Sequence, residues 1–490
     1  MIHVALVRVE YVEGDPQTYV LPLVFLTGDP AEQILKAAPH AIVARLEVRN
    51  RREQGILCDG TAETACCATL LQMIARRRNH KAAPGELLAS VTPAFRNISG
   101  ARLGPLEPSI VKAEQSNTSV VFGDRFILKL FRRLEPGVNP ELEIGRFLTE
   151  RRFPNFPAVA GALEYREDKA EPMSLAILQA FVPSSTDGWQ YTLDALGRYY
   201  ERVLAQGDPR QPACVPAERL LDVLDRELPP AASEMIGTYL ESARLIGQRT
   251  AELHVTLASD SENPDFSPEP FSALYQRSIY QSMRNTAAQS FHLLRTHCKK
   301  LPDSVREDAQ KVAGLEAEVL KRYRSLLSRK ITAMRVRCHG DYHLGQLLYT
   351  GKDFFIIDFE GEPARPLSER RLKRTALKDV AGMLRSFHYA AYAALFDVQT
   401  KGTLSTDGGS AEPWADFWYY WVSVVFLKAY VEAASRGGFL PAAREELQVL
   451  LDAFLLDKAV YELGYELNNR PTWVKIPLRG ILSLVGEENR

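Results

Sequence analysis

The chain changes its hydrophobic pattern along its length. Over the first hundred residues, apolar and polar positions alternate in short runs bounded by Gly, Pro and Asp, which is the pattern of half-buried β-strands. Strands are expected at His3–Val12, Thr18–Leu26, Ala44–Val48 and Gly55–Leu57. Thr61–Arg78 follows a helical period and ends in three arginines, which suits a solvated helix C-terminus. The pattern predicts a β-rich cap over residues 1–103.

Residues 104–188 carry a second group of apolar runs, which predict a small sheet. Strands are expected at Ser109–Glu114, Val120–Gly123, Phe126–Phe131 and Leu175–Val182, with one helix over Pro140–Glu150. The polar connection Gln115–Ser119 can present backbone N–H groups and hydroxyls to a phosphate. A plain polar hairpin turn explains the same residues equally well. The sequence contains neither a Walker A loop nor G-x-G-x-x-G.

A lysine interrupts the apolar run Phe126–Phe131. Lys129 is costly inside a strand unless its ammonium reaches a charged partner. Glu141 and Glu143 open the following helix, and both are candidate partners. Glu143 is preferred because Ile144, its neighbour, belongs to the side of the helix expected to be buried. The alternative is a lysine on the exposed face of an edge strand.

From residue 189 onwards the chain is predominantly helical. Helices are expected at Trp189–Leu204, Ala217–Glu227, Ala231–Leu257, Pro270–Cys298, Asp303–Ser328, Leu377–Phe396 and Glu445–Leu467. The last helix has an apolar face and an opposite stripe formed by Lys458, Tyr461, Glu462 and Tyr465. Two tyrosines beside charged groups suit a sugar, and interior packing is the rival interpretation.

One stretch, Cys338–Glu362, concentrates the chemistry. It contains two apolar runs, Leu347–Tyr349 and Phe354–Ile357, which predict a hairpin closed by a turn. His339-Gly340-Asp341 precedes the hairpin, and Asp358 ends it. A carboxylate at the end of a buried strand, beside a second acidic loop, is able to point into a common cleft.

Composition and charge exclude several classes of function. The chain has 490 residues, of which 46% are hydrophobic and 25% charged, as in ordinary globular proteins. Sixty Lys and Arg against 61 Asp and Glu argue against nucleic-acid binding through bulk positive charge. We expect no signal peptide and no membrane span, since the longest uncharged apolar run is Phe417–Leu427. Six scattered cysteines without Cys-x-x-Cys spacing predict reduced thiols in a cytoplasm and no structural zinc.

The spacing of the acidic residues matches a phosphoryl-transfer site. Protein kinases use Asp-x-x-x-x-Asn for the base and one metal ligand, and Asp-Phe-Gly after a strand for the second. Here Asp341 is followed five positions later by Gln346, and Asp358 follows the second apolar run within Asp-Phe-Glu. Gln346 keeps an amide oxygen for Mg²⁺ on a longer arm. The alternative is a hairpin whose aspartates only form turns.

These motifs resemble the aminoglycoside-phosphotransferase-like small-molecule kinases. Within them, Asp358–Arg370, Lys378–Phe387 and Lys458–Leu478 resemble the maltokinases. The resemblance covers nearly the whole chain, though it is thin over the first hundred residues. Pattern and resemblance together predict an α+β, bilobal, eukaryotic-protein-kinase-like fold with a β-rich N-terminal cap and a large helical C-lobe. The expected divisions are a cap over 1–103, a small nucleotide-clamp lobe over 104–188 and the helical C-lobe over 189–490.

The resemblance implies a specific reaction and a role for each motif residue. ATP would lie between the lobes and pass its γ-phosphate to the anomeric hydroxyl of maltose, feeding α-glucan (glycogen) synthesis. Lys129, oriented by Glu143, would hold the phosphates, and Gln346 and Asp358 would bind Mg²⁺. Asp341 would orient the acceptor hydroxyl and accept its proton.

Further contacts follow from the same resemblance. Phosphates are expected near Ser116, Asn117, Thr118 and Ser119, and adenine near the backbone of Gln179 and Phe181. The acceptor sugar is expected near His343, Glu360, Arg385, Lys458, Tyr461, Glu462, Tyr465 and Trp473. Arg385 pairs by spacing with His388, and surface exposure is the alternative for both. Asp379 either caps its helix or supports the loop of Asp341 from beneath.

Two other functions stay open. A glucosamine or other aminosugar kinase shares the motifs around Asp341 and Asp358, but a cationic acceptor needs a cluster of carboxylates, whereas the 458–473 stripe is mixed and aromatic. A nucleotide-binding regulatory module without turnover is the second alternative. The resemblance also suggests a trehalose synthase partner.

Overall fold

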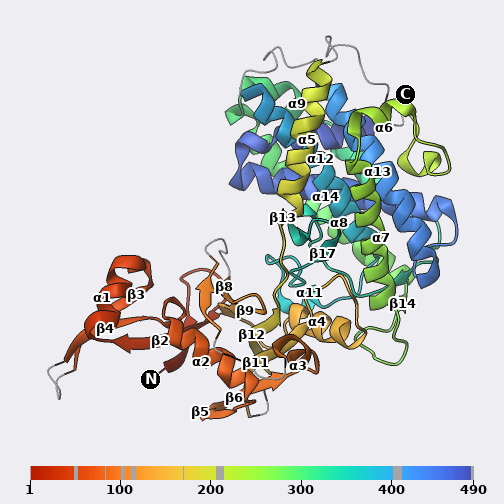
Figure 1. Ribbon diagram of the computed structural model, residues 1–490. Coiled ribbons are helices and arrows are strands. Elements are labelled where there is room, and N and C mark those ends of the chain that lie inside the picture. The colour runs from red at the N-terminus through yellow and green to blue at the C-terminus, as the bar shows by residue number, and fades with distance from the viewer. Residues whose placement is uncertain are drawn as a thin grey trace. The chain divides into compact units, whose positions relative to one another are not determined.

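The structure is a computed structural model of the 490-residue chain (Figure 1). It describes residues 2–48, 53–82, 84–100, 104, 106–111, 117–168, 170–205, 215–400 and 411–486. The chain forms two compact units. The first, the β-rich unit, comprises residues 1–183 and 363–370, and the second, the helical unit, comprises residues 184–362 and 371–490.

The β-rich unit begins with an antiparallel sheet whose strands match the alternating runs of the sequence. Its order is β1 (Ile2–Val9), β2 (Gln17–Leu26), β4 (Glu53–Asp59) and β3 (Ile42–Val48), and β10 (Arg133–Leu134) also pairs with β2. Helix α1 (Gly28–Ala37) buries Ala31 and Ile34 against Ile56 and Cys58 of β4. This small core explains why one face of β4 is apolar.

The second sheet of this unit joins strands from both sides of residue 103. Its order among the described residues is β5 (His80–Ala82), β6 (Gly85–Val91), β11 (Val159–Glu167), β12 (Met173–Ala180), β9 (Phe126–Phe131), β8 (Asn117–Phe122) and β7 (Pro108–Ile110). Helices α2 (Thr64–Ala75), α3 (Ala94–Ser99) and α4 (Pro140–Glu150) contact β11. Because this sheet includes strands from before and after residue 103, it does not separate the expected cap from the expected small lobe. The division into three parts with boundaries at 103 and 188 stays a prediction.

The helical unit is built from long helices around an apolar interior (Figure 1). They are α5 (Gly188–Ala205), α6 (Pro230–Ile236), α7 (Tyr239–Leu257), α8 (Ala273–His297), α9 (Asp303–Ala313), α10 (Glu316–Arg324), α12 (Leu377–Thr400), α13 (Glu412–Ala434), α14 (Arg444–Asn469) and α15 (Lys475–Gly486). Helix α13 packs against α7, α14 against α8, and α12 against both α13 and α14. None of the described helices combines the length and the hydropathy needed to cross a bilayer.

Three expected helices differ from the observed ones. Residues 231–257 split into α6 and α7 at Gly237, whose φ of +68° is a left-handed conformation that ends a helix. Residues 303–328 split into α9 and α10 at Gly314. Residues 217–227 form only a 3₁₀ turn at Leu220–Val223, before the Pro229-Pro230 pair that begins α6.

The expected hairpin is confirmed. Strand β16 (Leu347–Tyr349) pairs with β17 (Phe354–Ile356), and the backbone N–H of Thr350 donates to the carbonyl of Asp353 across the turn. β13 (Thr186–Asp187) extends this sheet next to β16. The hairpin thus fixes the position of Gln346, directly before β16, and that of Asp358, shortly after β17.

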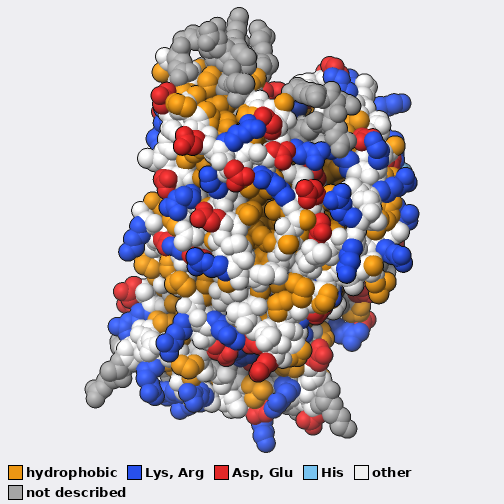
Figure 2. Space-filling model, turned by 90° about the vertical axis from the view of Figure 1, so that its right-hand side faces the viewer, with side chains coloured by type: hydrophobic (Ala, Val, Ile, Leu, Met, Phe, Trp, Pro, Cys, Tyr) orange, Lys and Arg blue, Asp and Glu red, His pale blue; other side chains and the backbone are white. Residues whose placement is uncertain are grey.

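The face of the molecule drawn in Figure 2 carries charged side chains of both signs. Figure 2 shows Lys and Arg side chains interspersed with Asp and Glu side chains over the face in view. This distribution agrees with the near-equal numbers of the two kinds of residue in the sequence.

Candidate active site

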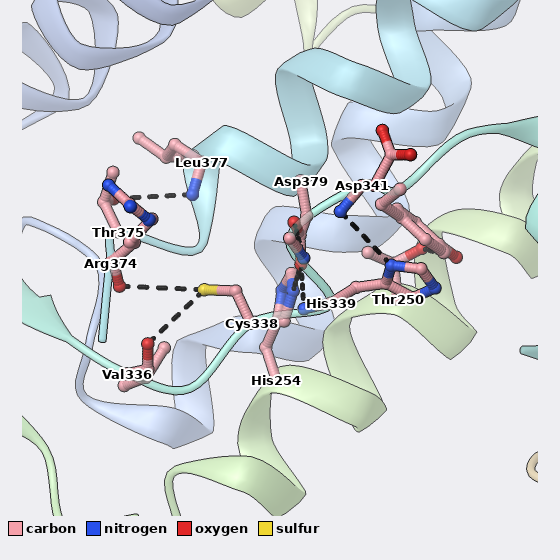
Figure 3. A network of polar contacts seen from close by, with 12 residues as sticks. Thr250, His254, Val336, Cys338, His339, Asp341, Arg374, Thr375, Leu377 and Asp379 are labelled. Atoms are coloured by element: carbon pink, nitrogen blue, oxygen red, sulfur yellow. Dashed lines mark hydrogen bonds and ion pairs between the residues drawn. The ribbon is translucent and has the colours of Figure 1, made fainter. Parts of the chain in front are cut away.

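The loop that carries Asp341 is held by a buried carboxylate on α12. Asp379 accepts hydrogen bonds from the backbone N–H groups of His339, at 2.7 Å, and Gly340, at 3.0 Å. Its second neighbour is His254 of α7, whose Nε2 lies 3.0 Å from Oδ2, while Nδ1 lies 3.0 Å from the hydroxyl of Tyr430. Figure 3 shows this network, with the Asp341 carboxylate pointing away from Asp379. Asp379 therefore supports the backbone of the loop, whereas the Asp341 carboxylate points to the other side.

Two features stabilise this loop: the lowered pKa of the Asp379 carboxyl, which accepts the hydrogen bonds of the loop, and the backbone conformation of Gly340. Burial by itself would raise the pKa of the Asp379 carboxyl, but the hydrogen bond with His254 and the charges around it hold that pKa below its ordinary value. Gly340 has a φ of +91°, and a Cβ there would lie 3.3 Å from the Cα of Gly361. The His-Gly-Asp sequence thus needs glycine at its centre.

Asp341 lies between two groups that are able to carry positive charge. Its Oδ1 is 3.8 Å from Nζ of Lys458, and its Oδ2 is 4.0 Å from Nε2 of His343. Burial acts to lower the pKa of Lys458, but Asp341, Glu462 and Glu362 raise it above its ordinary value. Lys458 is therefore a persistent cation beside the candidate base.

His343 has a structural task in the same loop. Its Nδ1 accepts a hydrogen bond from the N–H of Gly345 at 3.1 Å, which caps the 3₁₀ turn Leu344–Gln346. Burial lowers the pKa of His343, and the nearby Asp341 opposes this shift. The neutral imidazole fits a side chain that accepts a hydrogen bond at one nitrogen.

Gln346 and Asp358 are brought together by the hairpin. Nε2 of Gln346 donates to Oδ2 of Asp358 at 3.1 Å, and the N–H of Ile357 donates to the carbonyl of Gln346 at 3.0 Å. Asp358 has a φ of +64°, a left-handed conformation that costs roughly 1–3 kcal/mol and that proteins retain mainly at functional sites. A carboxylate and an amide on adjacent side chains offer the hard oxygen ligands that Mg²⁺ prefers. Glu360 follows in the same loop and is partly exposed.

In the β-rich unit, Lys129 has a buried acidic partner. Its Nζ lies 2.9 Å from Oε2 of Glu141, and the two side chains are 11% and 2% exposed. Asn139 caps α4 by accepting from the N–H of Glu141, which places this glutamate at the first turn of the helix. The preference for Glu143 is thus corrected to Glu141, because the cap and not the apolar period sets which glutamate reaches β9.

The described part of the expected phosphate connection is a strand. Ser116 lies outside the described residues. Asn117, Thr118 and Ser119 belong to β8 and lie opposite Phe131, Leu130 and Lys129 of β9. Thr118 Oγ1 accepts from Nε of Arg132 at 2.8 Å, and Ser119 is buried. These three residues are therefore corrected from a connection to a strand, since the pairing of β8 with β9 begins at Asn117, before the apolar residues of the strand.

The expected adenine contacts lie at the end of β12. Gln179 is buried and pairs with Ile127, and its Nε2 has no hydrogen-bond partner among the described residues. The N–H of Phe181 donates to the carbonyl of Arg125 at 2.8 Å, so this donor is already used. A role of either residue toward adenine stays a prediction.

Two expected acceptor residues face each other inside the helical unit. Nε and Nη2 of Arg385, on α12, donate to Oε2 of Glu462, on α14, at 2.9 and 2.8 Å. Both residues are buried, and so is His388. Surface exposure, the alternative interpretation for Arg385 and His388, is therefore wrong, because α12 packs against α14 and α13, and the role of Arg385 toward the acceptor stays a prediction.

The rest of the stripe forms an aromatic and basic surface. Nζ of Lys458 lies 5.1 Å from the ring centre of Tyr461, and the guanidinium of Arg470 lies 5.5 Å from that of Tyr465 and 5.0 Å from that of Trp473. Tyr465 is 46% exposed. Arg470 thus covers part of both rings, and the exposed part of Tyr465 remains accessible to a ligand near the end of α14.

One residue of the network had no sequence signal. His254 is a single histidine on a helix, without the spacing of a metal ligand, and it is fully buried between Asp379 and Tyr430. Its partners are 125 and 176 positions away, so no local pattern could have indicated them.

The geometry of Asp341, Gln346 and Asp358 agrees with the comparison with known proteins. Residues 109–361 match the model of the phosphotransferase enzyme family, APH. The chain belongs to this family. The phosphotransferase is 26% identical over 450 residues to the glucosamine kinase of Streptacidiphilus jiangxiensis, covering 88% of this chain and 82% of that one. It is 21% identical over 387 residues to the glucosamine kinase of Mycolicibacterium smegmatis, covering 77% and 79%.

A solved structure shares the fold of this phosphotransferase. Glucosamine kinase in complex with glucosamine, ADP and inorganic phosphate has a TM-score of 0.63 and 20% identity, over 99% of this chain and 94% of that one. The expected kinase-like α+β fold, with sheets in the N-terminal region and helices in the C-terminal part, is confirmed.

Proposed function

We propose that this phosphotransferase transfers the γ-phosphate of ATP to a hydroxyl of a neutral disaccharide, with maltose and its anomeric hydroxyl as the first candidate. The observation that carries the proposal is the loop of the helical unit in which Asp341, Gln346 and Asp358 are fixed by Asp379 and by the hairpin. Phosphoryl transfer depends on positioning and charge, and this arrangement supplies both.

Each residue has a distinct task in this reaction. Asp341 would orient the acceptor hydroxyl and take its proton, and Lys129, held by Glu141, would bind phosphate oxygens. Gln346 and Asp358 would hold Mg²⁺, because their oxygens are the ligand type this ion takes. When bound, the ion neutralises charge on the transferring phosphoryl group.

Lys458 supports a neutral acceptor. Its ammonium lies 3.8 Å from the carboxylate that would receive the acceptor hydroxyl. A protonated aminosugar entering beside Asp341 would bring a second cation near Lys458 and compete with it for Asp341. The nearby Glu462 and Glu362 would offset part of the repulsion between the two cations. A neutral sugar would meet no such repulsion and could accept a hydrogen bond from the ammonium.

Glucosamine is the second candidate, and the relatives favour it. Both curated relatives and the solved structure are named glucosamine kinases. The sequence identities of 26% and below leave room for a different acceptor, and the Lys458–Asp341 contact is the feature of this chain that argues for one.

An acceptor assay tests both candidates. The purified chain is incubated with Mg²⁺, ATP and either maltose, glucose or glucosamine, and ADP release is measured with Asp341→Asn as the blank. We expect turnover with maltose to exceed that with glucosamine, and phosphorus NMR to place the phosphate on the anomeric oxygen. Higher kcat/KM with glucosamine would assign the aminosugar reaction instead, and nucleotide binding without any product would indicate a regulatory module.

The remaining expectations belong to the same proposal. A trehalose synthase partner would supply the sugar, and a cytoplasmic location would keep the thiols reduced. Among the described cysteines, Cys58, Cys66, Cys67, Cys298 and Cys338 are free. Burial raises the pKa of Cys66 and of Cys67 to about 12, so both thiols are unreactive at neutral pH.

A further inference from the structure

The helical unit contains a cavity of about 710 Å³ that the proposed reaction does not use. Its walls are formed by parts of α12, α13, α14 and α15 and by the segment Val215–Leu220. None of the described residues that line it belongs to Cys338–Glu362. The cavity is therefore separate from the loop of Asp341.

The charged groups of the wall balance one another. The described lining contains three arginines and three carboxylates, which are Arg219, Arg385, Arg479, Glu412, Asp416 and Asp452. They are already engaged: Arg479 lies 3.2 Å from Glu412, and Arg219 lies 3.8 Å from Asp452. The hydroxyl of Tyr392 donates to Asp416 at 2.9 Å. A ligand with a net charge would have to break these contacts, so the wall favours a neutral ligand.

Three lining side chains have buried polar atoms without a hydrogen-bond partner among the described residues, and one of these atoms, Nε of Arg479, lies 3.1 Å from the carboxylate of Asp308. Among the described residues, Nδ1 of His388 and Oε1 of Gln448 are buried and accept or donate no hydrogen bond. His388 is only 3% exposed, and burial together with Arg385 lowers its pKa well below the ordinary value, so its imidazole is neutral. Buried polar atoms normally have hydrogen-bond partners. A ligand hydroxyl could supply one to each.

Aromatic rings complete the wall. Tyr392, Tyr419 and Tyr420 line the cavity, and the ring of His388 lies 4.8 Å from that of Tyr392 and 5.1 Å from that of Tyr419. Aromatic faces give a large apolar contact area and their hydroxyls add hydrogen-bonding groups. Together with neutral hydrogen-bonding atoms, these rings suit a molecule with apolar C–H faces and a rim of hydroxyls.

We propose that this cavity binds a neutral carbohydrate of two or three sugar rings. Its volume lies within the range of about 300–1,000 Å³ in which pockets enclose ligands of that size. The sugar hydroxyls would satisfy His388 and Gln448, and its ring faces would lie against the tyrosines. The site shares no described residue with the loop of Asp341, and of the acceptor contacts expected from the sequence only Arg385, which is held by Glu462, is among its described lining residues.

Calorimetric titration of the full chain with maltotriose tests this proposal. Ser483 lines the cavity and is exposed, so Ser483→Trp would fill the space with little risk to folding. Gln448→Leu would remove the unpartnered oxygen. We expect saturable binding of maltotriose to the wild type. In each of the two cavity variants, one binding site should be lost or its Kd should rise at least ten-fold. The control Ser435→Trp places the same side chain on an exposed serine at the end of α13, outside the cavity, and should bind like the wild type.

Two further measurements complete the test: the turnover of the Ser483→Trp variant and competition by the charged sugar glucose 6-phosphate. Ser483→Trp should keep wild-type turnover of the acceptor sugar when maltotriose is absent, so a failure of the proposed reaction shows in a different assay. Glucose 6-phosphate carries a similar ring with negative charge, and we expect it not to compete with maltotriose. Absence of binding to the wild type, unchanged binding by both cavity variants, or competition by the phosphate would each overturn the proposal.

Discussion

Nζ of Lys129 lies 2.9 Å from Oε2 of Glu141 inside the β-rich unit. Lys129 lies in the middle of β9, and Glu141 lies in the first turn of α4. Because both side chains are largely shielded from water, loss of either charge leaves the other in a buried site, so Glu141 contributes to the position of the ammonium.

Removing that carboxylate should reduce ATP-dependent turnover. Glu141→Gln would remove the carboxylate charge 2.9 Å from the ammonium of Lys129, and we expect kcat/KM for ATP to fall at least ten-fold, as measured by coupled ADP release. Breaking a buried pair destabilises by about 3–5 kcal/mol, so urea unfolding should show a lower midpoint. Glu143→Gln, on the same helix, is the matched control and should remain near wild type. Equal losses in both variants would contradict the assignment of Glu141.

Asp341→Asn should abolish transfer while nucleotide binding persists. The amide keeps the shape of the carboxylate but cannot accept the proton of the acceptor hydroxyl, and general-base catalysis typically contributes 10²–10⁴-fold. Turnover is measured by ADP release, and binding by titration with a non-hydrolysable ATP analogue in the presence of Mg²⁺. Simultaneous loss of nucleotide binding would move Asp341 from a base to a metal or folding role.

Local pattern predicted the elements where the sequence alone determines the conformation. Helix α4 and the hairpin of β16 and β17 appear at or within one residue of the expected positions, because Asn139-Pro140 and Thr350–Asp353 mark their starts and turns. The expected helix over 303–328 instead breaks at Gly314, where the apolar period continues across the break.

The partners of the side chains could not be predicted in the same way. Arg385 and Glu462 are 77 positions apart, and His254 and Asp379 are 125 apart. Such pairs depend on how α7, α12 and α14 pack, and helical period says only which face is buried. Gln346 and Asp358 could be predicted to lie together because one hairpin determines their proximity, and Asp341 was found by its spacing from Gln346.

Lys458→Gln should change the preference for the acceptor. The variant removes the cation beside Asp341, so we expect the ratio of kcat/KM for glucosamine to that for maltose to rise at least ten-fold. Lys475→Gln is the matched control, since Lys475 is 24% exposed against 30% for Lys458 and pairs with Glu412 elsewhere in the helical unit. A ratio that stays constant in Lys458→Gln would separate this lysine from acceptor recognition.

Asp379→Asn should alter the dependence of stability on pH. The folded-state pKa of Asp379 is below its ordinary value of 3.8, so its contribution to stability is present above that value and lost as the pH falls through the folded pKa. At pH 7 the variant should be less stable by about 1.5–3 kcal/mol, because the buried hydrogen bonds to the Asp379 carboxylate would be made to a neutral amide instead. The difference from the wild type should shrink below pH 4 in urea titrations. The exposed Asp397→Asn on the same helix should show no such difference, and a constant gap at all pH values would contradict the role of the charge.

Tyr465→Ala should raise the KM for the acceptor sugar with little effect on the KM for ATP. The ring is half exposed and lies beside Arg470, so a sugar could stack on it, and removal of one aromatic contact would cost about 0.5–1.5 kcal/mol, or roughly 2- to 13-fold in KM. Tyr11→Ala removes an equally exposed tyrosine, 45% against 46%, from the β-rich unit and serves as the control. Initial rates over a range of maltose concentrations give both constants. An acceptor KM that is unchanged in a folded Tyr465→Ala variant would exclude this part of α14 from the sugar site.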